Sequence, residues 1–326
     1  MENNYLPTKN NMRIIFMGTP EFAVASLDIL IKNHYNVVAV ITVPDKPAGR
    51  GRQINESDVK KYAKEHQLKI LQPEKLKNED FINELQALQP DLGIVVAFRM
   101  LPEIVWNMPR LGTFNLHASL LPQYRGAAPI NWAIINGEKE TGVSTFFLQH
   151  EIDTGNILFQ EKTKIGENET AGALHDKLML IGADLVLKTV QSIEANNYSL
   201  TNQTALASNL NILKSAPKIF KENCKINWNL PVNKIHDFIR GLSPYPAAWT
   251  TFNAADGKPH IAKIFSATVE QKPHNLIVGK VVSDNKTYLK IVAQDGFINI
   301  QTLQLAGRNK MSVQELLRGF KMQVDF

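Results

Sequence analysis

Two polar side chains suited to catalysis stand two residues apart at the end of an apolar run. Asn115 and His117 close the segment Gly112–His117, GTFNLH, whose pattern is typical of a buried strand. On an extended backbone, residues two apart point to the same side, so both groups can reach one small substrate. An amide can donate to a developing oxyanion, and an imidazole can accept a proton or, once charged, stabilise that oxyanion. A pair of polar residues satisfied locally at a strand end would have the same pattern.

A carboxylate that could serve the same site follows the predicted strand Gly142–Gln149. It is Asp153, in the segment HEIDTGNIL, directly before Thr154 and Gly155. A carboxylate at this edge of the sheet can orient His117 and raise its basicity. Asp-Thr-Gly is also ordinary turn chemistry, so both interpretations stay open.

A cationic loop follows the second predicted strand. The segment PDKPAGRGRQ, from Pro44 to Gln53, carries Lys46, Arg50 and Arg52 on a frame rich in proline and glycine. Such a loop is suited to phosphate contacts, which fix position without reading a base sequence. A solvated surface loop has the same composition.

Two other kinds of site are not predicted. Gly18 is the only glycine between Met12 and Ala48, so the G-x-G-x-x-G fingerprint of a dinucleotide site is missing. We expect no metal, because no third ligand accompanies His117 and Asp153 at a suitable spacing. The single cysteine, Cys224, excludes an internal disulfide and a zinc ribbon.

The elements that must position these residues alternate between strand and helix in the first part of the chain. Near-continuous apolar strands separated by helices indicate a parallel sheet covered on both faces, which is a doubly wound α/β fold. The predicted strands here are Arg13–Met17, Asn36–Val43, Leu92–Phe98, Gly112–His117 and Gly142–Gln149. The predicted helices are Glu21–Lys32, Ser57–His66, Asn78–Leu88, Pro129–Ile135 and Thr170–Ala195.

The last third of the chain has a different pattern of predicted elements. A polar stretch without periodicity precedes one helical stretch, Val232–Leu242, and a series of short β-like runs. Short strands at regular spacing favour a small β-barrel, of which an OB-like fold is one form. The runs are Ala248–Phe252, His260–Ala267, Leu276–Ser283, Thr287–Ala293 and Gly296–Leu305. The predicted organisation is a disordered tail (1–11), a catalytic domain (12–196), a linker (197–213) and a C-terminal OB-like domain (214–326).

Composition sets the class of protein and its partners. The chain of 326 residues is 44% hydrophobic and 21% charged, as in ordinary soluble proteins with two domains. No segment has the apolar length of a membrane span, and the N-terminal segment has no signal-peptide core, so we expect a cytoplasmic protein with no membrane partner. Residues 210–326 carry a net charge of +8 against −3 for the rest, which indicates a polyanionic partner or a lysine-rich soluble surface.

These motifs together resemble the methionyl-tRNA formyltransferases of the folate-dependent formyltransferase family. The resemblance runs from Arg13 to about Leu317 and includes RIIFMGTPEFA, PDKPAGRGRQ, NLHASLLPQYRGAAPINW, EIDTGNIL, RGLSPYPAAW and AGRNKMSVQELL. Relatives that formylate purine precursors or sugar nucleotides share the Asn-x-His core. The cationic loop and the C-terminal part resemble the tRNA-directed branch in particular. Arg99 stands where the family pattern has a glycine.

The resemblance implies a Rossmann-like mostly parallel catalytic domain and a monomer. It also implies transfer of the formyl group of 10-formyltetrahydrofolate to the α-amine of initiator methionyl-tRNA, with no metal. Asn115, His117 and Asp153 correspond to the family's catalytic residues, and either His117 or Asp153 takes the amine proton. By the same correspondence, the folate-contacting run is Ser119, Leu120, Leu121 and Pro122. Lys46, Arg50 and Arg52 lie in the loop that approaches the tRNA acceptor end, and the C-terminal OB-like domain helps to hold the tRNA.

Three other functions remain open. The first is formyl transfer to a small amine, such as an amino sugar nucleotide or a purine precursor. The second is hydrolysis of formyl-folate, with water as the acceptor. The third, from a different class, is RNA binding without catalysis, in which case salt-sensitive RNA binding would occur without turnover of the formyl donor.

Overall fold

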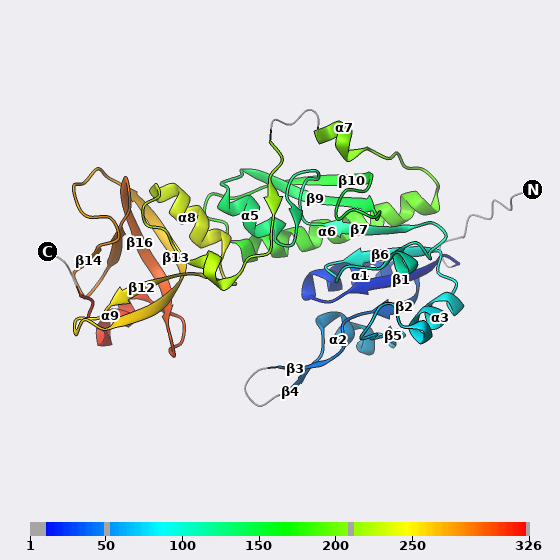
Figure 1. Ribbon diagram of the computed structural model, residues 1–326, viewed down its shortest axis with the longest axis horizontal. Helices are drawn as coiled ribbons and strands as arrows, with labels where there is room; N and C mark the ends of the chain where they lie inside the picture. The colour runs from blue at the N-terminus through cyan, green and yellow to red at the C-terminus, as the bar shows by residue number, and fades with distance from the viewer. Residues whose placement is uncertain (1–10, 49–52, 208–211, 324–326) are drawn as a thin grey trace, which may run out of the picture. The chain divides into compact units, whose positions relative to one another are not determined.

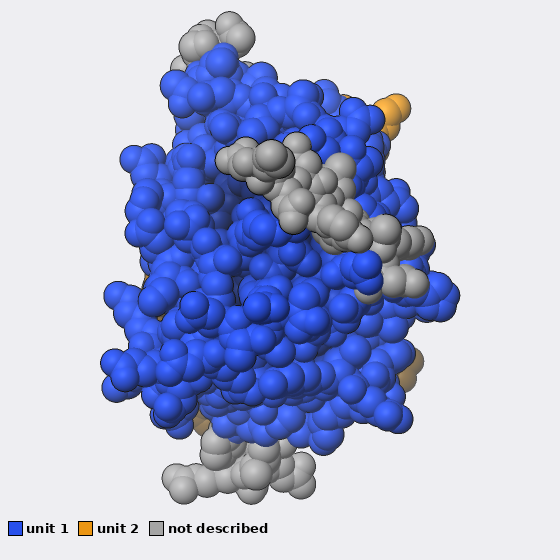
Figure 2. Space-filling view, turned by 90° about the vertical axis from the view of Figure 1, so that its right-hand side faces the viewer, with its two compact units in different colours: residues 1–125, 142–163, 175–214 blue, residues 126–141, 164–174, 215–326 orange. Residues whose placement is uncertain are grey.

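The computed structural model describes residues 11–48, 53–207 and 212–323, and the chain forms two compact units (Figures 1 and 2). Unit 1 comprises residues 1–125, 142–163 and 175–214, and unit 2 comprises residues 126–141, 164–174 and 215–326. Residues 1–10 of the predicted tail lie outside the described residues. The predicted division at 197–213 remains a prediction.

Unit 1 is built on a seven-stranded sheet with the order β10-β9-β7-β6-β1-β2-β5. The pairs β1–β2, β1–β6, β6–β7 and β2–β5 are parallel, and β7–β9 is antiparallel. This mostly parallel arrangement confirms the predicted Rossmann-like, doubly wound fold. The strands are β1 (Arg13–Gly18), β2 (Asn36–Ile41), β5 (Ile70–Leu71), β6 (Leu92–Val96), β7 (Thr113–His117), β9 (Glu140–Phe147) and β10 (Ile157–Lys164).

Three of the described helices were not predicted from the sequence: Glu103–Trp106, Gln203–Ala207 and Val313–Gly319. The other six lie where the sequence predicts them, within one residue at each end. Ser57 and Asn78 cap two of them, because each side chain accepts a hydrogen bond from a backbone N–H in the first turn. The helices of the chain are α1 (Glu21–Lys32), α2 (Asp58–Glu65), α3 (Glu79–Ala87), α4 (Glu103–Trp106), α5 (Pro129–Ile135), α6 (Ala171–Glu194), α7 (Gln203–Ala207), α8 (Val232–Gly241) and α9 (Val313–Gly319).

Both faces of the sheet are covered, which explains why its central strand β6 is apolar throughout. All five residues of β6 are buried. On one face, side chains of β1, β2 and β6 form a cluster with Phe81 and Leu85 of α3 and Val105 of α4. On β7, Leu116 packs against α6 at Gly182, where an added Cβ would lie 2.7 Å from the Leu116 side chain. A strand buried on both sides has no polar face to alternate with.

Unit 2 contains an antiparallel sheet with the order β12-β13-β16-β15-β14, and β17 pairs with β16. Its core also takes side chains from α8 and α9, such as Ile239 and Leu316. This antiparallel pairing agrees with the predicted OB-like domain. The strands are β12 (Ala248–Asn253), β13 (Pro259–Gln271), β14 (Val281–Ser283), β15 (Leu289–Val292), β16 (Gly296–Leu305) and β17 (Met311–Ser312).

One predicted strand of unit 2 is shorter than expected. The run Leu276–Ser283 is a strand only from Val281. Gly279 adopts a positive φ of 86°, which breaks the extended backbone, and its N–H donates to the carbonyl of Val292. The apolar residues before it, Leu276 and Ile277, are exposed.

Candidate active site

The strand β7 places Asn115 and His117 on the same side of the sheet of unit 1. Asn115 pairs with Phe146 of the antiparallel strand β9 and with Val95 of the parallel strand β6. The Asn115 side chain is half-buried, and among the described residues its amide has no hydrogen-bond partner. An amide that is held by its strand and left free of internal bonds can donate to a substrate oxygen.

The imidazole of His117 is buried, with 7% of its surface exposed, and both ring nitrogens face polar atoms. Its Nε2 atom lies 2.8 Å from the carbonyl oxygen of Tyr124. A carbonyl can only accept, so Nε2 carries a hydrogen and donates it. Its Nδ1 atom lies 3.9 Å from Oδ2 of Asp153, which is within ion-pair range but longer than a hydrogen bond. Nδ1 is therefore the ring nitrogen that can take up a proton, and a carboxylate faces it.

The turn that carries Asp153 is packed tightly against the end of β9. Asp153 has a φ of 55°, which lies in the left-handed region of backbone conformation that residues other than glycine rarely adopt. At Gly155 an added Cβ would lie 1.7 Å from the carbonyl oxygen of Phe147, so only glycine fits there. Thr154 closes the turn by donating from Oγ1 to the carbonyl of Glu151. The Asp-Thr-Gly segment thus forms a turn and also directs a carboxylate toward His117.

The loop after His117 is held by hydrogen bonds within unit 1. Ser119 is buried, and its hydroxyl donates to the carbonyl of Gln123 at 2.6 Å. The Ser144 hydroxyl donates to the carbonyl of Ser119 and accepts from the N–H of Leu121. Gln160 donates to the carbonyl of Leu121 and to the Ser144 hydroxyl. The backbone of this loop is therefore fixed before any ligand binds.

Leu120 and Pro122 complete the segment for which the family resemblance implies folate contact. Pro122 is buried and Leu120 is half-buried. Leu120 lies against Gly142 of β9, where an added Cβ would come within 2.6 Å of its side chain. Of the four residues of this segment, only Leu120 is not fully buried.

The cationic loop is a hairpin formed by β3 (Lys46–Ala48) and β4 (Gln53–Asn55), which pair in antiparallel fashion. It extends from the sheet next to α2 (Figure 1). Lys46 is exposed on this hairpin. Arg50 and Arg52, predicted to contact nucleic acid, lie outside the described residues.

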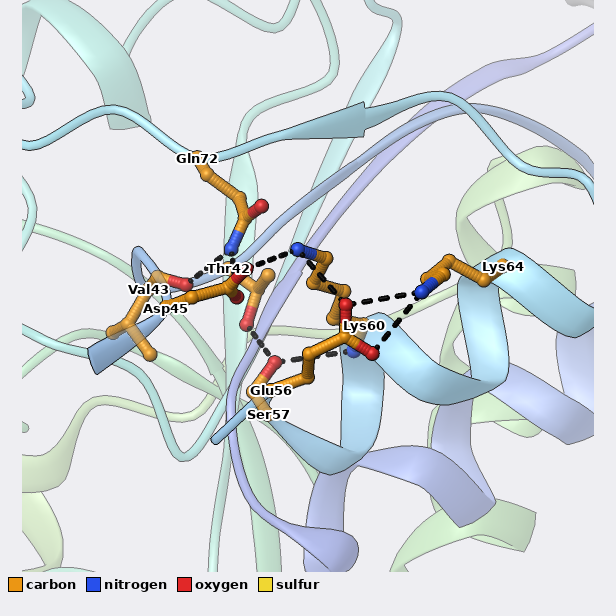
Figure 3. Close-up of polar contacts among 8 residues, drawn as sticks. All are labelled: Thr42, Val43, Asp45, Glu56, Ser57, Lys60, Lys64 and Gln72. Atoms are coloured by element: carbon orange, nitrogen blue, oxygen red, sulfur yellow. Dashed lines mark hydrogen bonds and ion pairs between the residues drawn. The ribbon is translucent and has the colours of Figure 1, made fainter. Parts of the chain in front are cut away.

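A network of charged side chains joins the two ends of this hairpin (Figure 3). Lys60 of α2 contacts Asp45 before the hairpin at 2.5 Å and Glu56 after it at 3.2 Å. Gln72, directly after β5, donates to Asp45, and Lys64 donates to Glu56. Hydrogen bonds from Lys60 and Gln72 lower the pKa of Asp45, and the bond to Asp45 raises the pKa of Lys60. Both partners are therefore charged at neutral pH.

Unit 2 contains a pocket of about 550 Å³ with a cationic and aromatic lining. Its described lining residues include three exposed lysines and no carboxylate: Lys218, Lys221 and Lys263. Tyr245 and Trp249 also line it, and Tyr245 is 81% exposed. Exposed aromatic rings beside ammonium groups are suited to nucleic acid, since rings stack on bases and ammonium groups contact phosphates.

The sequence matches two family models, one for each part of the chain. The model described as "Formyl transferase" matches residues 12–190, and the model described as "Formyl transferase, C-terminal domain" matches residues 218–321. The chain belongs to the formyl transferase family.

Relatives within the formyl transferase family match nearly the whole chain. A methionyl-tRNA formyltransferase from Phocaeicola vulgatus is 57% identical, over 96% of this chain and 97% of its own. One from Bacteroides thetaiotaomicron is 55% identical, over the same shares. Among solved structures, an N-formyltransferase from Helicobacter canadensis has a TM-score of 0.61 at 24% identity, covering 91% of this chain and 99% of its own.

One departure from the formyl transferase family pattern has a local structural role. Arg99 stands where the family pattern has a glycine, and its guanidinium donates to the carbonyls of Pro73 and Glu74. It also lies 5.7 Å from the ring of the neighbouring Phe98. Arg99 therefore ties the segment after β6 to the segment after β5.

Two residues at the candidate site were not predicted from the sequence. The first is Tyr124, which acts through its backbone carbonyl, a group that every residue carries. The second is Gln203, which lies in the segment predicted as a linker and is 1% exposed. A single glutamine in a polar stretch has no sequence pattern that predicts its burial.

Two further kinds of feature are absent from the described residues. No group of three or more His, Cys, Asp or Glu side chains that could hold a metal was found there. No described helix combines the length and apolarity needed to cross a bilayer.

Proposed function

We propose that this protein transfers the formyl group of 10-formyltetrahydrofolate to the α-amine of initiator methionyl-tRNA. The observation that carries this proposal is the match to methionyl-tRNA formyltransferases over almost the whole length of both chains. The placement of His117 between a carbonyl and a carboxylate supports it, because the reaction requires removal of a proton from an amine. The protein would act in the cytoplasm as a monomer.

In the proposed reaction the amine nitrogen attacks the formyl carbon, and the bond from that carbon to the folate nitrogen breaks. Asn115 donates a hydrogen bond to the oxygen of the tetrahedral species, since its amide is not engaged by any described residue. No covalent bond to the protein is needed. The proton leaves the attacking nitrogen and is available for the departing folate nitrogen.

The geometry favours Nδ1 of His117 as the atom that receives the amine proton. Nε2 already donates to Tyr124, so only Nδ1 has a free lone pair. When Nδ1 is protonated, the carboxylate of Asp153 at 3.9 Å balances the positive charge. Asp153 would thus orient and stabilise the imidazolium rather than act as the first acceptor.

The formyl donor would lie along the segment Ser119–Pro122. The half-buried side chain of Leu120 and the fixed backbone from Ser119 to Leu121 suit contact with the face of a ring system. We assign these four residues to donor binding on this ground and on the family resemblance.

The acceptor tRNA would be held by positive charge in two places. One is the β3–β4 hairpin with Lys46, Arg50 and Arg52, and the other is the lysine-lined pocket of unit 2. Phosphate contacts of this kind fix the position of an RNA and make its binding sensitive to salt. The C-terminal domain, residues 214–326, would therefore serve tRNA binding and the catalytic domain, residues 12–196, the chemistry.

The decisive experiment combines purified protein, 10-formyltetrahydrofolate and charged initiator or elongator methionyl-tRNA. Formylation of the initiator form supports the proposal. Formylation of an amino sugar nucleotide or a purine precursor, with no formylation of methionyl-tRNA, would favour the small-amine alternative. Release of formate without an amine would identify a hydrolase, and salt-sensitive RNA binding without turnover would identify a non-catalytic protein.

A further inference from the structure

Gln203 of α7 joins the two loops whose backbones surround His117. Its Nε2 donates to the carbonyl of Asp153 at 3.0 Å and to that of Gly155 at 2.8 Å. Its Oε1 accepts from Nε of Arg125 at 3.1 Å and from Nη2 of Arg125 at 2.7 Å. The amide thus uses both hydrogens and both lone pairs, which is the full capacity of a glutamine side chain.

Both loops held in this way contain a residue with an unfavourable backbone conformation. Tyr124, directly before Arg125, has a φ of 60°, and Asp153 has a φ of 55°. Left-handed backbone at residues other than glycine persists only where surrounding contacts enforce it. The carbonyl of Tyr124 contacts Nε2 of His117, and the carboxylate of Asp153 faces Nδ1. One buried amide therefore connects the partners of both ring nitrogens.

The position of Gln203 is itself fixed from both sides. Two residues before it, Thr201 forms a two-way backbone bridge with Ile157, with both N–H to O distances at 2.9 Å. Three residues after it, Leu206 packs against Leu121 and Phe146. The short helix α7 is thereby attached to unit 1 on each side of Gln203, and the Gln203 side chain is 1% exposed.

We propose that Gln203 is a positioning residue for the reaction: its side-chain amide sets the distance between His117 and Asp153 by holding the Tyr124–Arg125 loop and the Asp153 turn together. It touches no reacting atom and acts through His117. This inference rests on the proposed function for its kinetic consequence. Small displacements of catalytic groups lower the rate of the chemical step, so kcat is affected more than substrate binding.

The test compares Gln203→Met, which keeps the length but removes the amide, and Gln203→Glu, which keeps an acceptor for Arg125 but loses the two donated bonds. We expect each to lower kcat about tenfold or more, with KM for the formyl donor and for the tRNA within about twofold of wild type. The matched control is Gln149→Met, an exposed amide that donates to Thr154 in the same turn, with kcat expected within about twofold of wild type.

A second measurement makes the test independent of turnover. In ¹⁵N-histidine-labelled protein, the hydrogen bond from Nε2 of His117 gives a downfield ring N–H signal, which we expect to shift or disappear in both Gln203 variants but not in the control. A folded Gln203→Met or Gln203→Glu protein with wild-type kcat and an unchanged His117 signal would overturn the inference. A third outcome separates the two proposals. If the Gln203 variants lost the His117 signal seen in the wild type, but the wild type did not formylate tRNA, the proposed function would fail and the positioning role would stand.

Discussion

Nε2 of His117 donates to the carbonyl oxygen of Tyr124 at 2.8 Å, which leaves Nδ1 as the ring nitrogen open to a proton. The position of the ring hydrogen of His117 thus follows from one backbone carbonyl, and it determines which nitrogen can accept a proton. Asp153 faces Nδ1 and not Nε2, so in the proposed mechanism an imidazolium would be stabilised at the nitrogen that gains the proton. Asn115, two residues earlier on the same strand, is left free to donate to the substrate oxygen.

The oxyanion role of Asn115 is tested by Asn115→Ala. Loss of one oxyanion donor costs about 2.7–4 kcal/mol in the transition state, so kcat should fall about 10²–10³-fold. Binding of tRNA should be almost unchanged, because the amide acts on the reacting oxygen. Steady-state kinetics with saturating formyl donor measure both quantities, and exposed Asn197→Ala serves as control. A near-normal kcat would remove Asn115 from the mechanism.

The role of Asp153 is tested by Asp153→Asn, which keeps size but removes the charge that faces Nδ1 of His117. We expect kcat to fall on the order of 10³–10⁴-fold, as when the carboxylate of a catalytic triad is replaced by its amide. Exposed Glu151→Gln, in the same turn, is the matched control. An equal loss in both variants would mean that the turn conformation, and not the charge beside His117, is what matters.

The strands and the pair Asn115–His117 could be predicted because both depend on local sequence. Buried runs such as Leu92–Val96 mark the sheet, and alternation on an extended strand places residues 115 and 117 on one side. Asp153 could be proposed from its turn, although the turn alone was equally good evidence of a structural role.

The rest of the site depends on contacts between distant parts of the chain. Gln203 lies 78 residues from Arg125 and 50 from Asp153, and no periodicity links them. Tyr124 contributes a carbonyl whose direction follows from a positive φ that its side chain does not signal. Lys60 occurs in an amphipathic helix, where a lysine ordinarily faces solvent, yet its side chain is only 14% exposed.

The lysines that line the pocket of unit 2 should contribute to tRNA binding and little to chemistry. Each of Lys218→Ala, Lys221→Ala and Lys263→Ala should raise KM for tRNA and reduce the slope of log affinity against log salt by about 1. Filter binding or anisotropy over a range of salt measures that slope. Lys286→Ala, an exposed lysine that does not line the pocket, is the control. An unchanged slope in all three variants would exclude this pocket from the tRNA interface.

The charged network at the base of the β3–β4 hairpin should affect the use of tRNA through the orientation of that hairpin. Lys60→Met keeps the apolar stem but breaks the contacts to Asp45 and Glu56. We expect KM for tRNA to rise about tenfold, equivalent to about 1.4 kcal/mol of binding, while KM for the formyl donor stays unchanged. Lys61→Met, which removes only an exposed pair with Asp58, is the matched control. Equal effects of the two substitutions would show that general charge, not the anchoring of the hairpin, governs binding.

His236 of α8 should make the stability of unit 2 depend on pH. Burial, and secondarily the positive charge of Arg240, lower the pKa of His236 below its ordinary value of 6.5. Below pH 6.5 the unfolded chain takes up a proton at this residue that the folded chain does not, so the free energy of unfolding falls as the pH decreases toward the folded-state pKa. Urea unfolding at a series of pH values measures this, and His236→Asn should make the dependence shallower, whereas exposed His34→Asn should not. An equally steep acid limb in His236→Asn and the wild type would assign the pH dependence to other groups.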